Sequence, residues 1–209
     1  MFKIIIQIII LIYLIATFYH SSQLQKYNTN GFIIDTDDEK TMFRNLEILN
    51  PVLLKSNIDY HTKEKLISSF KDKQLFQKIT VQNDFDINQL PKPEFHFPIQ
   101  KSISVLDQSI PLKKCIHNYN IICLLEGECT FYLFNPKHTD EIQNKENHQI
   151  RKWGHKKKVQ KGEILLIPPF WSYLQEVQQK TIQYHIDIDN YFTFIVNFLK
   201  EFYFGYVDG

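Results

Sequence analysis

One histidine–carboxylate pair on a predicted strand of this 209-residue sequence has a spacing that a metal site could use. His185 and Asp187 are separated by a single residue, and imidazole and carboxylate groups are both ligands of transition metals. The pair lies in residues 181–189, where polar and apolar residues alternate as in a half-buried strand. His185 and Asp187 share their face with Thr181 and Gln183, so the pattern favours a solvent-facing pair over a metal site.

No other histidine or cysteine adds to this pair. Five further histidines lie in helical, loop or charged contexts, namely His61, His96, His138, His148 and His155. The three cysteines are Cys115, Cys123 and Cys129. Their odd number and their spacing indicate neither a disulfide framework nor a zinc site.

The elements that must position such residues are mainly strands. Gly162 is a turn signal, and residues 164–167 form a short apolar run typical of a strand buried on both faces. Pro168 and Pro169 cannot donate ladder hydrogen bonds, so this strand ends there and a second one follows to residue 177. Further elements are predicted as strands at 50–55, 77–81, 120–125 and 129–134, helices at 60–70 and 191–202, and loops at 90–98 and 137–158.

Two of these motifs resemble one family. The Gly-acid-aliphatic-Ile-Pro-Pro-x-Trp pattern that ends at Trp171 resembles the closing motif of cupin-like domains of the JmjC and asparaginyl-hydroxylase type. The hairpin that begins at Asn120 resembles the Asn-Leu-Leu-Cys hairpin of the same family. The resemblance implies a mainly β fold with flanking helices, a double-stranded β-helix or cupin jelly-roll. Its motif residues here are Gly162, Pro168, Pro169, Trp171 and Asn120.

The same resemblance implies that the metal chemistry of the family is lost. Active members hold iron with two histidines and one carboxylate. The corresponding positions, counted from Asn120 and from the Pro-Pro-x-Trp motif, are Lys114, Ile116 and Tyr173. None of these side chains offers an imidazole or a carboxylate. We therefore expect a degenerate member without cofactor, in which the three side chains converge in the barrel.

The N-terminus is a separate element. Residues 4–19 are nearly all apolar, which predicts a transmembrane signal anchor over residues 1–20 and a single-pass membrane protein. A cleaved signal peptide is less favoured because bulky aromatic residues occupy its cleavage region, and a buried helix is a third reading. A linker at residues 21–31 and a cupin-like domain at residues 32–209 follow. The net charge of +1 does not favour nucleic acid as a partner.

The functional prediction is a membrane-anchored cupin-like protein with a non-catalytic binding or scaffold role. The alternative is an Fe(II)/2-oxoglutarate-dependent oxygenase, of hydroxylase or demethylase type, with atypical ligands. A cupin that binds a sugar or another small ligand at the barrel mouth is a third hypothesis. The expected partners are a membrane through the N-terminal helix, and a protein or a second copy through the C-terminal helix.

Overall fold

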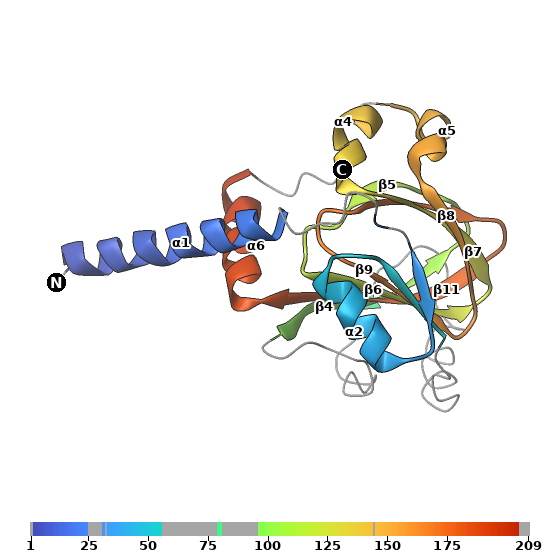
Figure 1. Cartoon of the computed structure of the whole chain (residues 1–209), viewed down its shortest axis with the longest axis horizontal. Helices are drawn as coiled ribbons and strands as arrows, with labels where there is room; N and C mark the ends of the chain where they lie inside the picture. Colours follow the sequence, from blue (N-terminus) through green and yellow to red (C-terminus); the bar gives the residue numbers. More distant parts are fainter. Residues whose placement is uncertain are drawn as a thin grey trace.

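The computed structural model of this chain describes residues 2–24, 31, 33–55, 79–80, 96–143 and 145–204. Two sheets form a barrel, and helix α1 projects from one end of it (Figure 1). The strands are β1 (Ile34–Thr36), β2 (Val52–Lys55), β3 (Ile79–Thr80), β4 (His96–Leu106), β5 (Ile110–Lys114), β6 (Tyr119–Glu126), β7 (Glu128–Phe134), β8 (His155–Gln160), β9 (Glu163–Ile167), β10 (Ser172–Val177) and β11 (Thr181–Asn190). The helices are α1 (Phe2–Leu24), α2 (Glu39–Glu47), α4 (Thr139–Ile142), α5 (Asn147–Ile150) and α6 (Tyr191–Phe204), with 3-10 turns η2 (Pro136–His138) and η3 (Arg151–Trp153).

The strand order is that of a double-stranded β-helix. The large sheet has the order β1-β2-β9-β6-β11-β4-β3, and the small sheet has the order β5-β10-β7-β8. From β4 to β11 the chain alternates between the sheets, except that β7 and β8 are consecutive neighbours in the small one. Four strands of each sheet thus enclose one interior. The predicted mainly β jelly-roll with flanking helices is confirmed.

The Pro-Pro corner carries the chain from one sheet to the other. β9 pairs with β2 and β6 in the large sheet, whereas β10 pairs with β5 and β7 in the small one. Pro168 and Pro169 fall at the crossing, where no ladder hydrogen bond is required. Trp171 follows with 0% of its surface exposed, and its indole N–H donates to the carbonyl of Leu49 at 2.8 Å. The two predicted strands and the buried tryptophan are confirmed.

Two glycines close the tight turns of this barrel. Gly127, between β6 and β7, has φ +83°, and a Cβ there would lie 2.9 Å from the carbonyl oxygen of Lys180. Gly162, before β9, has φ +89°, and its N–H donates to the carbonyl of Leu124 at 2.8 Å. Both positions require the conformational freedom of glycine. The turn at Gly162 lies where it was predicted, and a turn is also present at Gly127. The predicted hairpin is wrong, because β6 pairs within the large sheet and β7 within the small one.

Two apolar clusters lie on opposite faces of the large sheet. The outer cluster joins Ile121 and Ile186 to Met42 and Leu46 of α2, whose first turn is capped by the side chain of Asp38. The inner cluster lies between the sheets and includes Trp171, with Leu165, Ile167, Phe131 and Tyr173 among its members. The large sheet is therefore covered on both sides at its centre.

Some strands, helices and loops have other bounds in the structure than the sequence predicted. Residues 137–158, expected as a loop, contain η2, α4, α5 and η3, and β8 begins within them at His155. β4 begins at His96, inside a segment expected as a loop. The strand expected at 77–81 is present at Ile79–Thr80, where it pairs with β4. The helix expected at 60–70 lies outside the described residues.

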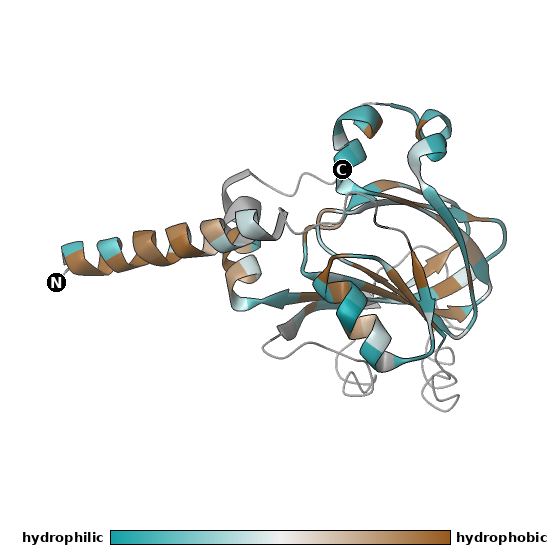
Figure 2. Ribbon diagram, in the orientation of Figure 1, coloured by the Kyte–Doolittle hydropathy of each residue, from teal (hydrophilic) through white to brown (hydrophobic). Residues whose placement is uncertain are grey.

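Helix α1 is apolar and largely exposed (Figure 2). It extends to Leu24, into the expected linker. Within the described part of the chain, no helix has both the length and the apolar character needed to cross a membrane. This finding does not bear out the spanning segment expected over residues 1–20. Lys3 and Gln7 near one end and His20 to Ser22 near the other shorten the apolar stretch.

Candidate functional site

Strand β11 directs its polar side chains into the barrel. Asp187 is 8% exposed and Asp189 is 0% exposed, and the register places Asp187 beside Asn120 of β6. The alternate apolar residues, such as Ile186, face the outer cluster beneath α2. The expected solvent-facing polar side is wrong, because β11 is a central strand between β6 and β4 and both of its faces are covered.

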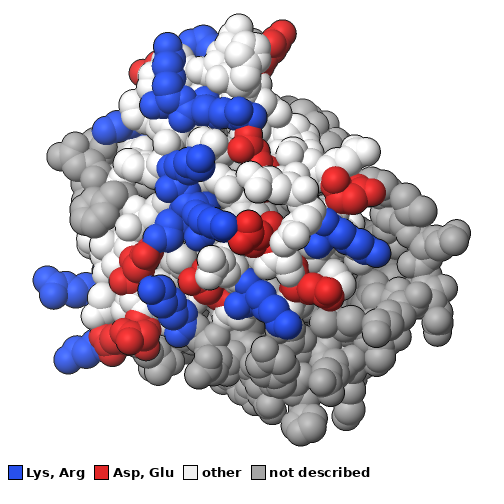
Figure 3. All heavy atoms as spheres, turned by 90° about the vertical axis from the view of Figure 1, so that its right-hand side faces the viewer, with Lys and Arg blue, Asp and Glu red and all other residues white. Residues whose placement is uncertain are grey.

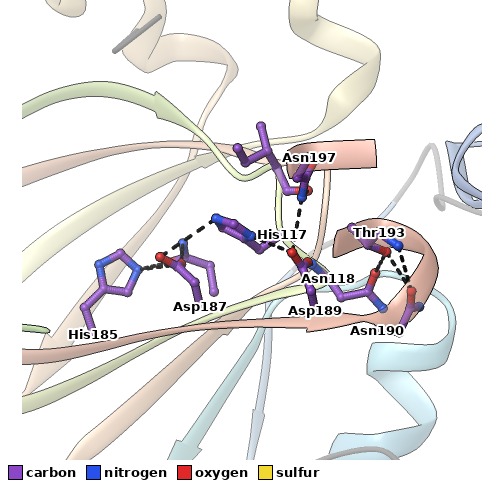
Figure 4. A network of polar contacts seen from close by, with 10 residues as sticks. His117, Asn118, His185, Asp187, Asp189, Asn190, Thr193 and Asn197 are labelled. Atoms are coloured by element: carbon purple, nitrogen blue, oxygen red, sulfur yellow. Dashed lines mark hydrogen bonds and ion pairs between the residues drawn. The ribbon is translucent and has the colours of Figure 1, made fainter. Parts of the chain in front are cut away.

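Two histidines flank the carboxylate of Asp187 (Figure 4). His185 Nε2 lies 3.2 Å from Asp187 Oδ1, and His117 Nε2 lies 4.0 Å from Asp187 Oδ2. The other ring nitrogen of His117, Nδ1, lies 2.9 Å from Asp189 Oδ2. Histidine and aspartate thus alternate along a chain of four side chains, His185, Asp187, His117 and Asp189.

The hydrogen bonds of Asn120 fix the proton on one of these imidazoles. Asn120 Nδ2 donates to Asp187 Oδ1 at 2.7 Å, because a carboxylate only accepts. The amide oxygen of Asn120 therefore faces His185 Nε2, 2.7 Å away, and that nitrogen must be the donor. By the same argument His117 Nδ1 donates to Asp189. The acceptors therefore assign one N–H on each ring, at Nε2 of His185 and at Nδ1 of His117.

Asp189 is the most enclosed member of the network. Besides His117, it accepts from the backbone N–H of Asn118 at 2.9 Å and from Asn197 Nδ2 of α6 at 3.3 Å. Asn197 Nδ2 also donates to the carbonyl of Ile116 at 3.1 Å. These charge-assisted hydrogen bonds offset the desolvation of a carboxylate with no exposed surface. They also tie α6 to the segment that joins β5 to β6.

Cys115 and Tyr173 lie beside this network and are held in their neutral forms. Burial raises the pKa of the Cys115 thiol well above its usual range, and the charge of Asp187 raises it further. Burial likewise raises the pKa of the Tyr173 phenol, with contributions from Cys115 and Asp187. A thiol that stays protonated is a poor nucleophile and a poor metal ligand.

The three positions assigned to the lost metal triad do not converge. Tyr173 is buried in the barrel at 3% exposure, whereas Ile116 is 40% exposed and Lys114 is exposed. Tyr173 pairs with Lys113, and Lys114 pairs with Ser172, so Lys113 shares the face of Tyr173 and Lys114 does not. Counting back from Asn120 carried over the spacing of the family's motif, in which the pair lies just before the strand. β5 instead ends at Lys114, and residues 115–118 cross between the sheets.

The crossing explains why Cys115 is the residue that enters the interior. Its N–H donates to the carbonyl of Trp171 at 2.8 Å, and its carbonyl accepts from the N–H of Phe170 at 2.9 Å. These two bonds dock the segment against the Pro-Pro corner. His117 follows two residues later and joins the network.

The side chains of the network do not fit a metal ion in this arrangement. Within the described ranges, no group of three or more His, Cys, Asp and Glu side chains is placed to hold one. The hydrogen of His185 Nε2 is directed at Asn120, and the two imidazoles approach different oxygens of Asp187. Metal binding would require His185 to give up that proton.

A second polar contact crosses the interior between the sheets. Gln175 of β10 is 0% exposed, and its Nε2 donates to Gln183 Oε1 of β11 at 2.8 Å. Among the described residues, the side-chain oxygen of Gln175 has no hydrogen-bond partner. The barrel therefore contains one buried acceptor that a ligand or a water could satisfy.

The basic residues near Trp153 form a mixed rather than a purely cationic surface (Figure 3). Arg151 pairs with Glu176, Lys157 pairs with Asp35, and Lys158 Nζ lies 2.8 Å from Glu128. Lys152 lies over the ring of Trp153, 4.2 Å from its centroid. Because carboxylates are interspersed with the cations, this face does not form a continuous anion-binding site.

The sequence contained only part of the signal for this network. The spacing of His185 and Asp187 marked one half of it, and Asn120 was singled out for its place in the hairpin. His117 and Asp189 were missed because they lie 72 residues apart. The alternation of residues 181–189 gave no cue to this contact, because it fits a strand with one face in water as well as one covered on both faces.

No protein-family model matches the sequence, and no curated protein matches it. Three solved structures resemble the fold, each at 10–11% identity. A protein from Neisseria meningitidis has a TM-score of 0.38, with 60% of this chain and 95% of that chain covered. A cupin-2 domain containing protein from Shewanella frigidimarina has a TM-score of 0.36, with 62% and 92% covered. Hydroquinone 1,2-dioxygenase from Sphingomonas, with 4-hydroxybenzoate bound, has a TM-score of 0.33, with 47% and 62% covered. Because these TM-scores are below 0.5, the likenesses carry no argument about this chain.

Proposed function

We propose that this chain is a non-catalytic, cupin-like binding or scaffold domain. The proposal rests on the side chains that lie in and around the barrel where β5 meets β10. Cys115 and Tyr173 enter the interior there and remain protonated, while Lys113 and Lys114 are exposed. These groups cannot form the two-histidine, one-carboxylate set that iron requires. A binding role is further supported by the unpaired oxygen of Gln175 in the interior.

We also propose that α1 attaches the domain to a membrane. Isoleucine and leucine side chains along residues 4–15 are 40–60% exposed. A patch of this size is unfavourable in water and marks an interaction site. The full-length chain should remain in the membrane fraction after washing with carbonate. Release of the intact chain by that wash would overturn the attachment and leave the proposal for the barrel untouched.

A second candidate function is the Fe(II)/2-oxoglutarate oxygenase with atypical ligands. It is favoured by one observation, that His117 and His185 both direct Nε2 toward Asp187, at 4.0 and 3.2 Å. Asp189 would orient His117 as an outer partner of a metal ligand. His185 would have to shift its proton and release Asn120 for these three groups to bind a metal.

Anaerobic titration of the full-length chain in detergent with Fe(II), and with Co(II) as a spectroscopic probe, separates the two candidates. We expect no stoichiometric binding by the wild type. The variant Asp187→Asn tests the network, and Asp107→Asn, at an exposed position between β4 and β5, is its matched control. One-to-one binding that Asp187→Asn loses and Asp107→Asn keeps would overturn the non-catalytic proposal. Succinate formation from 2-oxoglutarate by the iron-loaded chain would then establish the oxygenase.

A further inference from the structure

Helices α1 and α6 meet at one end of the molecule. The rings of Tyr19 and Phe192 have centroids 4.9 Å apart, and Asn190 Nδ2 donates to the hydroxyl of Tyr19 at 3.2 Å. Ala16 of α1 is fully buried at this junction. Figure 1 shows α6 running crosswise to α1, at the point where α1 leaves the barrel. The base of α1 is thus held against a second helix.

Between Ile8 and Ile15 helix α1 is apolar on every side. Three consecutive residues, Ile4, Ile5 and Ile6, are 60%, 47% and 40% exposed, and every residue from Ile8 to Ile15 is also exposed, by 42–60%. Consecutive residues of a helix point about 100° apart, so the exposed surface encircles the helix. A protein partner on one side would leave the other sides in water. The hydrocarbon of a lipid layer would cover such a helix on every side.

Helix α6 has an aromatic face that is turned away from the barrel. Thr193, Val196 and Asn197 are buried and make the contacts with the barrel. Tyr191, Phe194 and Phe198 lie on the far side at helical spacing, with 65%, 38% and 54% of their surfaces exposed. The rings of Phe194 and Phe198 are 5.9 Å apart. We call these three residues the aromatic face of α6.

The opposite end of the molecule is charged. Figure 3 views the protein from the side away from the free end of α1, and lysines, arginines and carboxylates are interspersed with uncharged residues over the described part of that face. Lys156, Lys157 and Lys158 all lie on β8 there. The molecule is therefore polarised, with apolar and aromatic residues around α1 and α6 and hydrated charges at the far end.

We propose that the aromatic face of α6 lies in the interfacial layer of a membrane and fixes the orientation of the barrel above it. The inference rests on the proposed attachment through α1. Aromatic rings are favoured at the boundary between headgroups and acyl chains. Because α6 is crosswise to α1, it lies along the surface when α1 enters the lipid. Asn197 then connects this surface helix to Asp189 of the buried network.

The test uses the full-length chain with a tryptophan reporter, in phosphatidylcholine vesicles with or without bromine on the acyl chains near the headgroup. Phe198→Trp and Phe194→Trp place the reporter on the aromatic face. Lys158→Trp is the control at the opposite end of the molecule, because Lys158 lies on β8 with 54% of its side chain exposed. Subtraction of the wild-type signal removes Trp153 and Trp171. We expect brominated lipid to remove most of the reporter emission at positions 198 and 194, and none at position 158.

The outcomes separate the inference from the attachment on which it depends. Vesicles that carry the protein upward in a density gradient without quenching either α6 reporter would leave the attachment intact and overturn the inference. A blue-shifted reporter without quenching would show that a second copy covers α6, which also overturns it. Failure of the wild type to float with vesicles would overturn the attachment and the inference together.

Discussion

The interior of this barrel has an apolar half and a polar half, both closed to water. Trp171, Phe131 and Leu165 belong to the first half and are fully buried. His117 and Asp189 belong to the second and are 8% and 0% exposed. Apolar burial is non-directional and depends on volume, whereas buried polar groups must each find a partner. The halves should therefore respond to different kinds of substitution.

The largest loss of stability is expected from a substitution in the apolar half. Trp171→Ala removes the largest fully buried side chain and should lower the free energy of unfolding by ~3–5 kcal/mol. The control is Trp153→Ala, at a partly exposed position, which should cost less than about 1 kcal/mol. Urea unfolding of both variants gives the comparison. Similar losses at the two positions would contradict the assigned packing.

The second largest loss of stability is expected in the polar half. The substitution there removes a hydrogen-bond acceptor and leaves the volume of the side chain nearly unchanged. Asp189→Asn keeps the shape of the side chain but turns an N–H₂ group toward the donors of His117 or Asn197. We expect a loss of about 2–3 kcal/mol, the cost of leaving buried donors without acceptors. Leu165→Met is the matched exchange in the apolar half and should cost less than about 1.5 kcal/mol. A tolerated Asp189→Asn would show that the network is not formed as described.

Alkaline pH should lower the stability of the fold through a buried thiol in the apolar half. Burial raises the pKa of the Cys129 thiol from 9.0 to about 12. Between these values the unfolded chain releases the proton while the folded chain retains it, so stability is complete below pH 9 and is lost as the pH rises toward 12. The loss is about 1.4 kcal/mol per pH unit for this thiol. Cys129→Ala should flatten the decline between pH 9 and 11, and an unchanged slope would count against it.

The smallest change in stability is expected from a substitution at the surface, outside both halves of the interior. Lys158 pairs with Glu128 at 2.8 Å, but its side chain is 54% exposed. Lys158→Ala should therefore change the free energy of unfolding by no more than about 1 kcal/mol, and less at high salt. Thermal unfolding at two salt concentrations measures it. A larger, salt-independent loss would indicate that β8 depends on this pair for its position.

The parts that could be predicted are those with local chemical signatures. The corner at Pro168 and Pro169, the turn at Gly127 and the helix after Asn190 follow from missing donors, positive φ and helical periodicity. The positions of Lys114 and Ile116 could not be predicted by counting from Asn120, because the chain leaves β5 and crosses to the other sheet between them. A strand period extrapolated through such a crossing loses its register.

The sequence by itself determined that residues 181–189 have one apolar and one polar face, because side chains alternate along any strand. It did not determine which face would meet water. That was decided when β6 and β4 paired on either side of β11 and the small sheet closed over its polar face. His117 and Asn197 reach Asp189 from segments distant in the chain, and only the closed barrel brings these groups within hydrogen-bonding distance.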